Sequence, residues 1–104
     1  MARRKGAEFN NLTREHVHRR SESSCERCGA QEEDLELHHR LALWFAAEYF
    51  PQLSSHILSS VANSEMLCRP CHKAHHRKDR WGRNNKHYEE IGKGLEAMDT
   101  MRLF

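Results

Sequence analysis

Two short stretches, Cys25-Glu-Arg-Cys28 and Cys68-Arg-Pro-Cys71, decide how this chain folds, because they contain all four of its cysteines. Two residues between paired cysteines let both sulfurs reach one tetrahedral ion at about 2.3 Å. Four thiolates close the coordination shell and leave no position for water, which is typical of a structural zinc site. The pattern therefore predicts a zinc ion that joins two segments lying far apart in the sequence.

The same four cysteines would also suit two disulfides. The chain begins Met1-Ala-Arg-Arg-Lys5, which lacks the apolar stretch of a secretion signal, and it has no apolar run long enough to cross a membrane. We therefore expect a cytoplasmic protein without a membrane partner. In a reducing compartment, paired cysteines bind metal more often than they form disulfides, so we favour the zinc interpretation.

The composition indicates a chain that needs such a cross-link. It has 104 residues, of which 38% are hydrophobic and 31% are charged. This length suits one domain, but the apolar content provides a thin core for it. We predict a basic, flexible N-terminus over residues 1–8 and a single domain over residues 9–104.

Basic residues gather after the second cysteine pair. The net charge is only +2, yet residues 69–86 contain seven lysines and arginines and one acid, Asp79. Such a segment attracts phosphate, but it would equally form a solvated helix face, so the charges alone leave both interpretations open. The candidates for phosphate contact are Lys73, Arg77, Lys78 and Arg80.

Hydrophobic periodicity and turn residues predict an α+β chain. Helices are expected over residues 10–22, 41–50, 71–80 and 86–98. Alternation of apolar and polar residues predicts short strands over residues 35–39 and 63–67. Asn11 or Thr13 would cap the first helix. The aromatic residues of the second helix should pack the core; they are Trp44, Phe45 and Phe50.

Histidines cluster in two places. The chain has nine, and five of them are His38, His39, His72, His75 and His76. His72 and His76 are four residues apart on a predicted helix, so they share a face. Neutral imidazole binds divalent metals and is a good base near pH 7. We place His75 in the solvent or on a phosphate.

Taken together, these residues resemble the HNH endonucleases, whose core is a ββα-metal unit. The matching residues are Leu37-His38-His39, Asn63, Leu67-Cys68-Arg-Pro-Cys71-His72 and His76. The resemblance runs from Cys25 to about Arg77, which is about half of the chain. It implies a small zinc-stapled ββα-metal core over about residues 25–80, with flanking helices. Residues 40–62 form an insert that makes the gap before Asn63 longer than in many members of the family.

The resemblance implies a metal-dependent DNA endonuclease that hydrolyses phosphodiester bonds. His39 would be the general base that takes a proton from the attacking water, and Asn63 would hold the loop and orient His39. His38 and His72 would bind the catalytic divalent ion, with His76 as a further ligand. Strand alternation sends His38 and His39 to opposite sides. The ion would be Mn²⁺ or Mg²⁺, and Ni²⁺, Co²⁺ or Zn²⁺ would also suit histidine ligands.

The implied partner is DNA, cut with low sequence specificity by nicking or by double-strand cleavage. The chain would act as a monomer or a homodimer and would be of bacterial or phage origin. Two other functions fit the same residues. A non-catalytic four-cysteine zinc module would bind DNA or protein without needing His39. A metal store or sensor would bind more than two ions per chain and would leave DNA intact.

Overall fold

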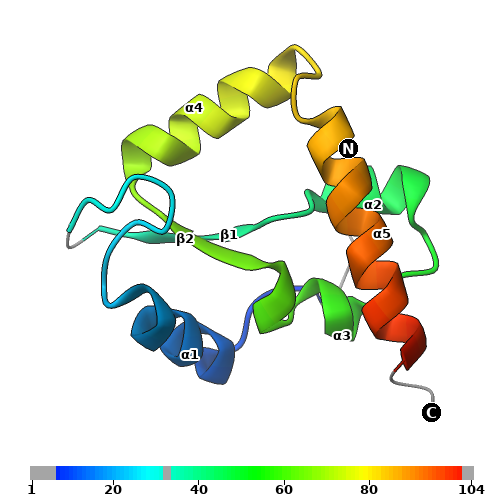
Figure 1. The fold of residues 1–104 in the computed structure, drawn as a ribbon, viewed down its shortest axis with the longest axis horizontal. Coiled ribbons are helices and arrows are strands. Elements are labelled where there is room, and N and C mark those ends of the chain that lie inside the picture. Colours follow the sequence, from blue (N-terminus) through cyan, green and yellow to red (C-terminus); the bar gives the residue numbers. More distant parts are fainter. Residues whose placement is uncertain (1–6, 32–33, 102–104) are drawn as a thin grey trace.

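Helices and a two-stranded sheet make up the computed structural model, which describes residues 7–31 and 34–101. The helices are α1 (Asn11–Ser21), α2 (Leu43–Tyr49), α3 (Ser55–Leu58), the short 3-10 helix η1 (Val61–Asn63), α4 (Arg69–Arg80) and α5 (Asn85–Met101). The strands are β1 (Glu36–His39) and β2 (Ser64–Leu67). This arrangement confirms the α+β class (Figure 1). None of the helices in the described part of the chain combines the length and apolarity needed to cross a membrane.

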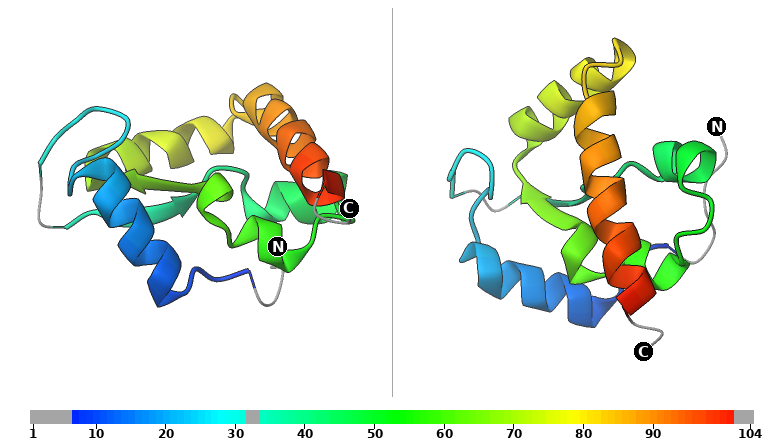
Figure 2. Two further views of the ribbon diagram at one scale, coloured as in Figure 1. Left: turned by 60° about the horizontal axis from the view of Figure 1, so that its bottom comes forward. Right: turned by 45° about the vertical axis from the view of Figure 1, so that its right-hand side comes forward.

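The two strands pair antiparallel, with Glu36 opposite Leu67 and His39 opposite Ser64. Their connection contains α2, α3 and η1, so the insert between the strands supplies helices rather than a tight hairpin. α4 begins directly after β2 and contacts β1. Figures 1 and 2 show α4 along one side of the strands and α1 along the other. The sheet therefore holds His38 of β1 against the histidines of α4.

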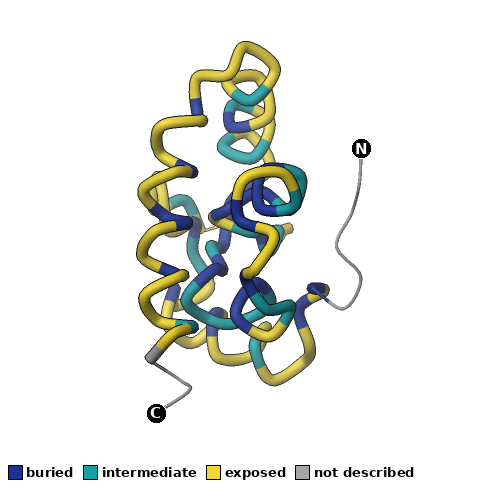
Figure 3. Tube along the Cα trace, turned by 90° about the vertical axis from the view of Figure 1, so that its right-hand side faces the viewer, coloured by how far each residue is buried: buried dark blue, intermediate teal, exposed yellow. Residues whose placement is uncertain are grey.

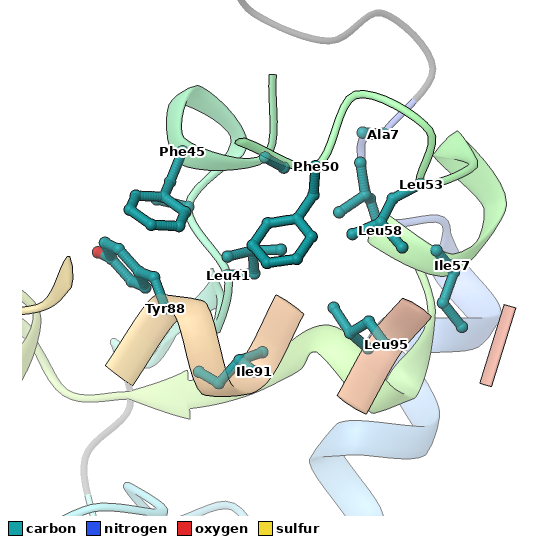
Figure 4. Packing of buried hydrophobic residues seen from close by; sticks show 12 residues of the cluster. Ala7, Leu41, Phe45, Phe50, Leu53, Ile57, Leu58, Tyr88, Ile91 and Leu95 are labelled. Carbon is teal, nitrogen blue, oxygen red and sulfur yellow. The ribbon is translucent and has the colours of Figure 1, made fainter. Parts of the chain in front are cut away.

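The larger core lies where α2, α3 and α5 meet, away from the cysteines. Buried positions recur along the inner side of α5, while its outer side is exposed (Figure 3), as expected for an amphipathic helix. Phe45 and Phe50 lie in this core, as predicted, and Trp44 packs against it half-buried. The other large buried side chains are Leu41, Leu53, Ile57, Leu58, Tyr88, Ile91 and Leu95 (Figure 4).

A second, smaller cluster surrounds the cysteines. It consists of buried Cys25, Leu67 and Cys68, with Ala30, Leu35 and Cys71 packed against it half-buried. So few apolar side chains cannot keep this part of the molecule folded by hydrophobic burial alone. This end of the molecule needs a cross-link, and the cysteines are in place to provide one.

Three details differ from the sequence prediction. The cap of α1 is Asn10 rather than Asn11 or Thr13, since the helix begins at Asn11 and Asn10 Oδ1 accepts a hydrogen bond from Thr13 N at 2.8 Å. α4 begins at Arg69 rather than Cys71, with Pro70 in its first turn. Ala7 is fully buried, so the packed part of the chain begins before residue 9. Residues 1–6 of the predicted flexible N-terminus lie outside the described residues.

Gly92 allows α5 to approach Phe50 closely. A Cβ atom on residue 92 would lie 2.3 Å from Phe50 Cε2. Gly92→Ala should therefore lower the free energy of unfolding by about 1–3 kcal/mol, because the core becomes overpacked. Gly94→Ala is the matched control, since nothing lies within 4 Å of its Cβ position. It should stabilise α5 by about 0.5–1 kcal/mol. Urea denaturation of the zinc-loaded proteins measures both, and equal effects would contradict this packing.

Candidate functional site

The four cysteines come together beside the start of α4. Their Sγ atoms all lie within 4.8 Å of one another, and Cys28 Sγ lies 3.6 Å from Cys68 Sγ. Two sulfurs bound to one tetrahedral zinc would be about 3.8 Å apart. All four cysteines are free of disulfides. The group therefore fits a structural metal ion such as zinc, as predicted from the spacing.

The first cysteine pair lies in a tight turn. Gly29 N donates to Cys25 O at 2.8 Å, and Cys28 N donates to Cys25 Sγ at 3.4 Å. Gly29 has φ +80°, a conformation that glycine adopts without strain, so the chain reverses there as predicted. The bond from Cys28 points a backbone N–H group at Cys25 Sγ, where it would stabilise a thiolate.

The metal-free cysteines differ in acidity. Burial raises the pKa of Cys25, but hydrogen bonds from the backbone of Cys68, Cys28 and Arg27 outweigh burial and lower that pKa to about 6. The adjacent Cys68 sulfur, together with burial, raises the pKa of Cys71 to about 12. The Cys25 thiolate therefore forms readily, whereas Cys68 and Cys71 resist ionisation. A bound cation would remove that resistance, because it compensates the repulsion between thiolates.

Polar contacts tie the first cysteine turn to β2. Glu26 N donates to Met66 O at 2.8 Å, and Glu26 Oε1 accepts from Met66 N at 2.9 Å. Arg20 holds the Glu26 carboxylate through two nitrogens at 2.6 and 2.7 Å, and Arg27 pairs with Glu65 at 2.7 Å. These links place Cys25 and Cys28 opposite the second cysteine pair.

Histidines of β1 and α4 form a second group of donor atoms. His72 Nε2 lies 3.1 Å from His76 Nε2. Two imidazole nitrogens bound to one ion at about 2.1 Å would be about 3.0 Å apart in octahedral geometry and about 3.4 Å in tetrahedral geometry. The His38 ring centroid lies 5.0 Å from that of His72 and 6.5 Å from that of His76. The predicted ligands are therefore neighbours, and the pair on α4 has the spacing of a shared ion.

The two groups differ in how closely their donors converge. Among residues 7–31 and 34–101, the cysteines are the one set of three or more such side chains whose ligand atoms gather within 4.8 Å. The geometry thus supports His72 and His76 as a pair, and the addition of His38 belongs to the proposal below.

Glu36 orients His72. Its Oε2 lies 3.1 Å from His72 Nδ1, and Arg69 lies on the same carboxylate at 3.8 Å. Because a carboxylate accepts, His72 donates its Nδ1–H and presents the Nε2 lone pair toward His76. Histidines that bind metals commonly donate their second ring nitrogen to a carboxylate in this way. The sequence analysis missed Glu36, although its position two residues before His38 on a strand puts it on the same face.

His38 is a buried imidazole with an unused nitrogen. The side chain is 8% exposed, and its Nε2 has no hydrogen-bond partner among the described residues. Burial, assisted by the neighbouring His75 and His72, lowers the pKa of His38 to about 2. The ring is therefore neutral at physiological pH, which is the form that binds metals. An unsatisfied buried polar atom is destabilising unless a ligand meets it.

Strand alternation predicts different surroundings for His38 and His39, and His39 packs against the segment before α1 whereas His38 packs against α4. The Nε2 of His39 lies 2.7 Å from Ala7 O, so the ring donates this proton to the carbonyl. The ring also stacks on Phe9 with centroids 4.0 Å apart. The N-terminal segment before α1 thus sets the plane and the tautomer of the His39 ring, an arrangement that no local sequence pattern indicates.

Asn63 is fully buried and holds the loop after β1. Its Oδ1 accepts from Leu41 N at 2.7 Å, and its Nδ2 donates to Leu58 O at 2.9 Å. Its backbone carbonyl accepts from Arg40 N at 2.9 Å. Through these bonds Asn63 ties the start of the long insert between the strands to its end.

A cavity of about 910 Å³ joins the histidines to the surface. His38 and His39 line it from β1, and His72 and His76 line it from α4. The remaining lining is aromatic, aliphatic or charged, and includes Phe9, Trp44, Arg14, Asp79 and Arg80. This size falls in the range of ligand pockets. The charged lining consists of two arginines, Arg14 and Arg80, and two carboxylates, Glu8 and Asp79.

His75 is not in the solvent, contrary to the sequence prediction. It is 2% exposed. Its Nδ1 accepts from Arg27 at 3.4 Å, and its Nε2 lies 2.6 Å from Tyr88 Oη, which in turn donates to Asp79 Oδ1 at 2.6 Å. Burial lowers the pKa of His75, and burial with the Asp79 contact raises the pKa of Tyr88. The reason for the error is that α5 covers this side of α4.

The predicted phosphate-contacting residues are all exposed on α4: Lys73, Arg77, Lys78 and Arg80. Of these, Arg80 lines the cavity.

Comparison of the chain with models of protein families, with curated proteins and with solved structures found no match.

Proposed function

We propose that the chain is a metal-dependent DNA endonuclease of the HNH type, with a structural zinc on the four cysteines and a divalent ion on the histidines. The observation that carries the proposal is the 3.1 Å spacing of His72 Nε2 and His76 Nε2 at the wall of a cavity that His39 also lines. The four cysteines fit a non-catalytic zinc module equally well. The histidines distinguish the two functions, because a binding module does not need them.

In this proposal His39 is the general base. Because Ala7 O takes the Nε2 proton, the basic atom of the neutral ring is Nδ1. Stacking on Phe9 holds the ring plane, so Nδ1 keeps one direction relative to the cavity. A neutral histidine held in one orientation accepts a proton from the attacking water efficiently near pH 7.

His72, His76 and His38 hold the divalent ion in this proposal. When bound, such an ion supplies positive charge to the pentacoordinate phosphate and to the leaving 3′ oxygen. Glu36 keeps the Nε2 of His72 directed at the ion by accepting its other proton. Arg80 lines the cavity wall, and in this proposal it contacts the scissile strand.

Supercoiled plasmid tests the proposal directly. Zinc-loaded protein should convert it to open-circular DNA when Mn²⁺, Mg²⁺, Ni²⁺ or Co²⁺ is added, because one active site cuts one strand. The same protein without added metal is the control and should leave the plasmid supercoiled. Plasmid that stays intact with all four ions would contradict the nuclease and favour the non-catalytic module.

A further inference from the structure

The outer side of α4 carries a row of exposed side chains that the proposed chemistry does not use. Lys73, Arg77 and Trp81 lie at positions i, i+4 and i+8, so they follow one side of the helix to its C-terminal cap. Trp81 is 73% exposed. We call these three residues the Lys73–Trp81 row. The next row around the helix is His72, His76 and Arg80.

The cations of this row lack acidic partners among the residues that the structure describes. Some other arginines are paired with carboxylates, such as Arg20 with Glu26 and Arg27 with Glu65. No ion pair between described residues involves Lys73 or Arg77. The positive charge of the row is therefore uncompensated, which is the electrostatic feature that binds a phosphate backbone.

The one acid of this segment is turned inward. Asp79 accepts hydrogen bonds from Tyr88, Asn84 and Trp44, at 2.6, 3.0 and 3.4 Å. These contacts fasten the end of α4 to α5 and α2. The carboxylate therefore lies on the side of α4 that faces α5 and the cavity, and the side that carries Lys73 and Arg77 keeps its basic character.

Trp81 indicates which form of DNA this surface fits. Its exposed ring lies at the end of a row whose members are spaced about 6 Å apart along the helix axis. In a paired duplex each base is stacked between its neighbours, so its faces are covered. An unpaired base presents a free face, and stacking on an aromatic side chain beside basic residues is how proteins bind single strands.

We propose that the Lys73–Trp81 row binds an unpaired DNA strand, with Lys73 and Arg77 on phosphates and Trp81 stacked on a base. The choice of DNA rests on the proposed function. His76 and Trp81 are five residues apart, which is about 7.5 Å along the helix axis and about 140° around it, so a strand stacked on Trp81 has to pass around α4 to reach the histidine pair. The preferred substrate is therefore DNA with an unpaired segment within a few nucleotides of the scissile phosphate.

Binding without catalysis tests this inference. The full-length, zinc-loaded protein is titrated into a labelled single strand of about 16 nucleotides and into a blunt duplex of the same sequence, with no divalent ion added. Fluorescence anisotropy should show tighter binding to the single strand. Trp81→Ala should raise the Kd for the single strand about tenfold or more and change the Kd for the duplex much less. Trp81→Phe should keep most of the affinity.

The control is Tyr49→Ala, which removes an exposed aromatic ring from α2 and should leave both affinities unchanged. Circular dichroism confirms that each variant is folded. Equal losses on both DNAs, no loss with Trp81→Ala, or tighter binding of an RNA strand of the same sequence would overturn the inference. This binding experiment contains no divalent ion, so its result does not depend on catalysis. Strand binding through Trp81 could be observed even if plasmid cleavage failed, and plasmid cleavage could be observed even if this binding failed.

Discussion

Replacing Cys25 with serine should leave the chain without a stable fold at neutral pH. Cys25 is 2% exposed, and its sulfur is one of four that gather within 4.8 Å. In small zinc domains metal binding contributes on the order of 10 kcal/mol to folding. That is as large as the whole stability of a typical domain, about 5–15 kcal/mol. The small cluster around the cysteines has no other source of comparable stabilisation.

Circular dichroism and elemental analysis together measure this effect. The wild-type protein should carry one tightly bound zinc per chain and unfold when a strong chelator removes it. Cys25→Ser should carry none and show little helix. Ser24→Ala is the control one residue away; it loses one hydrogen bond, to Ser21 O, and should stay folded at a loss of about 1 kcal/mol. A Cys25→Ser protein with a wild-type spectrum and a cooperative melt would show that the cysteines are not the cross-link.

The α+β class and the cysteine group were predictable because their signals are local. A Cys-x-x-Cys spacing limits where two sulfurs can lie, and short alternating or periodic segments indicate strands and helices. The burial of His75 was not predictable in this way. His75 is the one buried residue of α4. Because it is polar, no repeat of apolar residues in the sequence indicated which side of this helix faces α5.

The contacts around His39 were even harder to predict from local sequence patterns. Ala7 contacts His39 across 32 residues of sequence, and this contact depends on how the segment before α1 runs past β1. No motif records such a contact. Glu36 is different, because its place on the same strand face as His38 was visible in the alternation of β1. Local patterns thus indicated the possible ligands, and the tertiary structure added the groups that orient them.

On the proposed function, His39→Ala and His72→Ala should both abolish plasmid cleavage, but for different reasons. His39→Ala removes the general base, whose contribution is typically about 10²–10⁴-fold in rate, and leaves the metal-binding histidines in place. His72→Ala removes one of the two nitrogens that lie 3.1 Å apart, so it should lose the divalent ion itself. Neither histidine belongs to the cysteine group, so both variants should keep one zinc per chain and a wild-type spectrum.

Calorimetric titration with Ni²⁺ separates the two roles without relying on activity. His39→Ala should bind Ni²⁺ as the wild type does, whereas His72→Ala should show no high-affinity binding. Glu36→Gln weakens the acceptor that orients His72 and should reduce affinity about 10–100-fold. The control is His87→Ala, which removes an exposed histidine on α5 outside the cluster. If His39→Ala cleaved plasmid at the wild-type rate, His39 would not be the general base. Unchanged Ni²⁺ affinity in His72→Ala would remove the metal site, because no other described pair of histidines has this spacing.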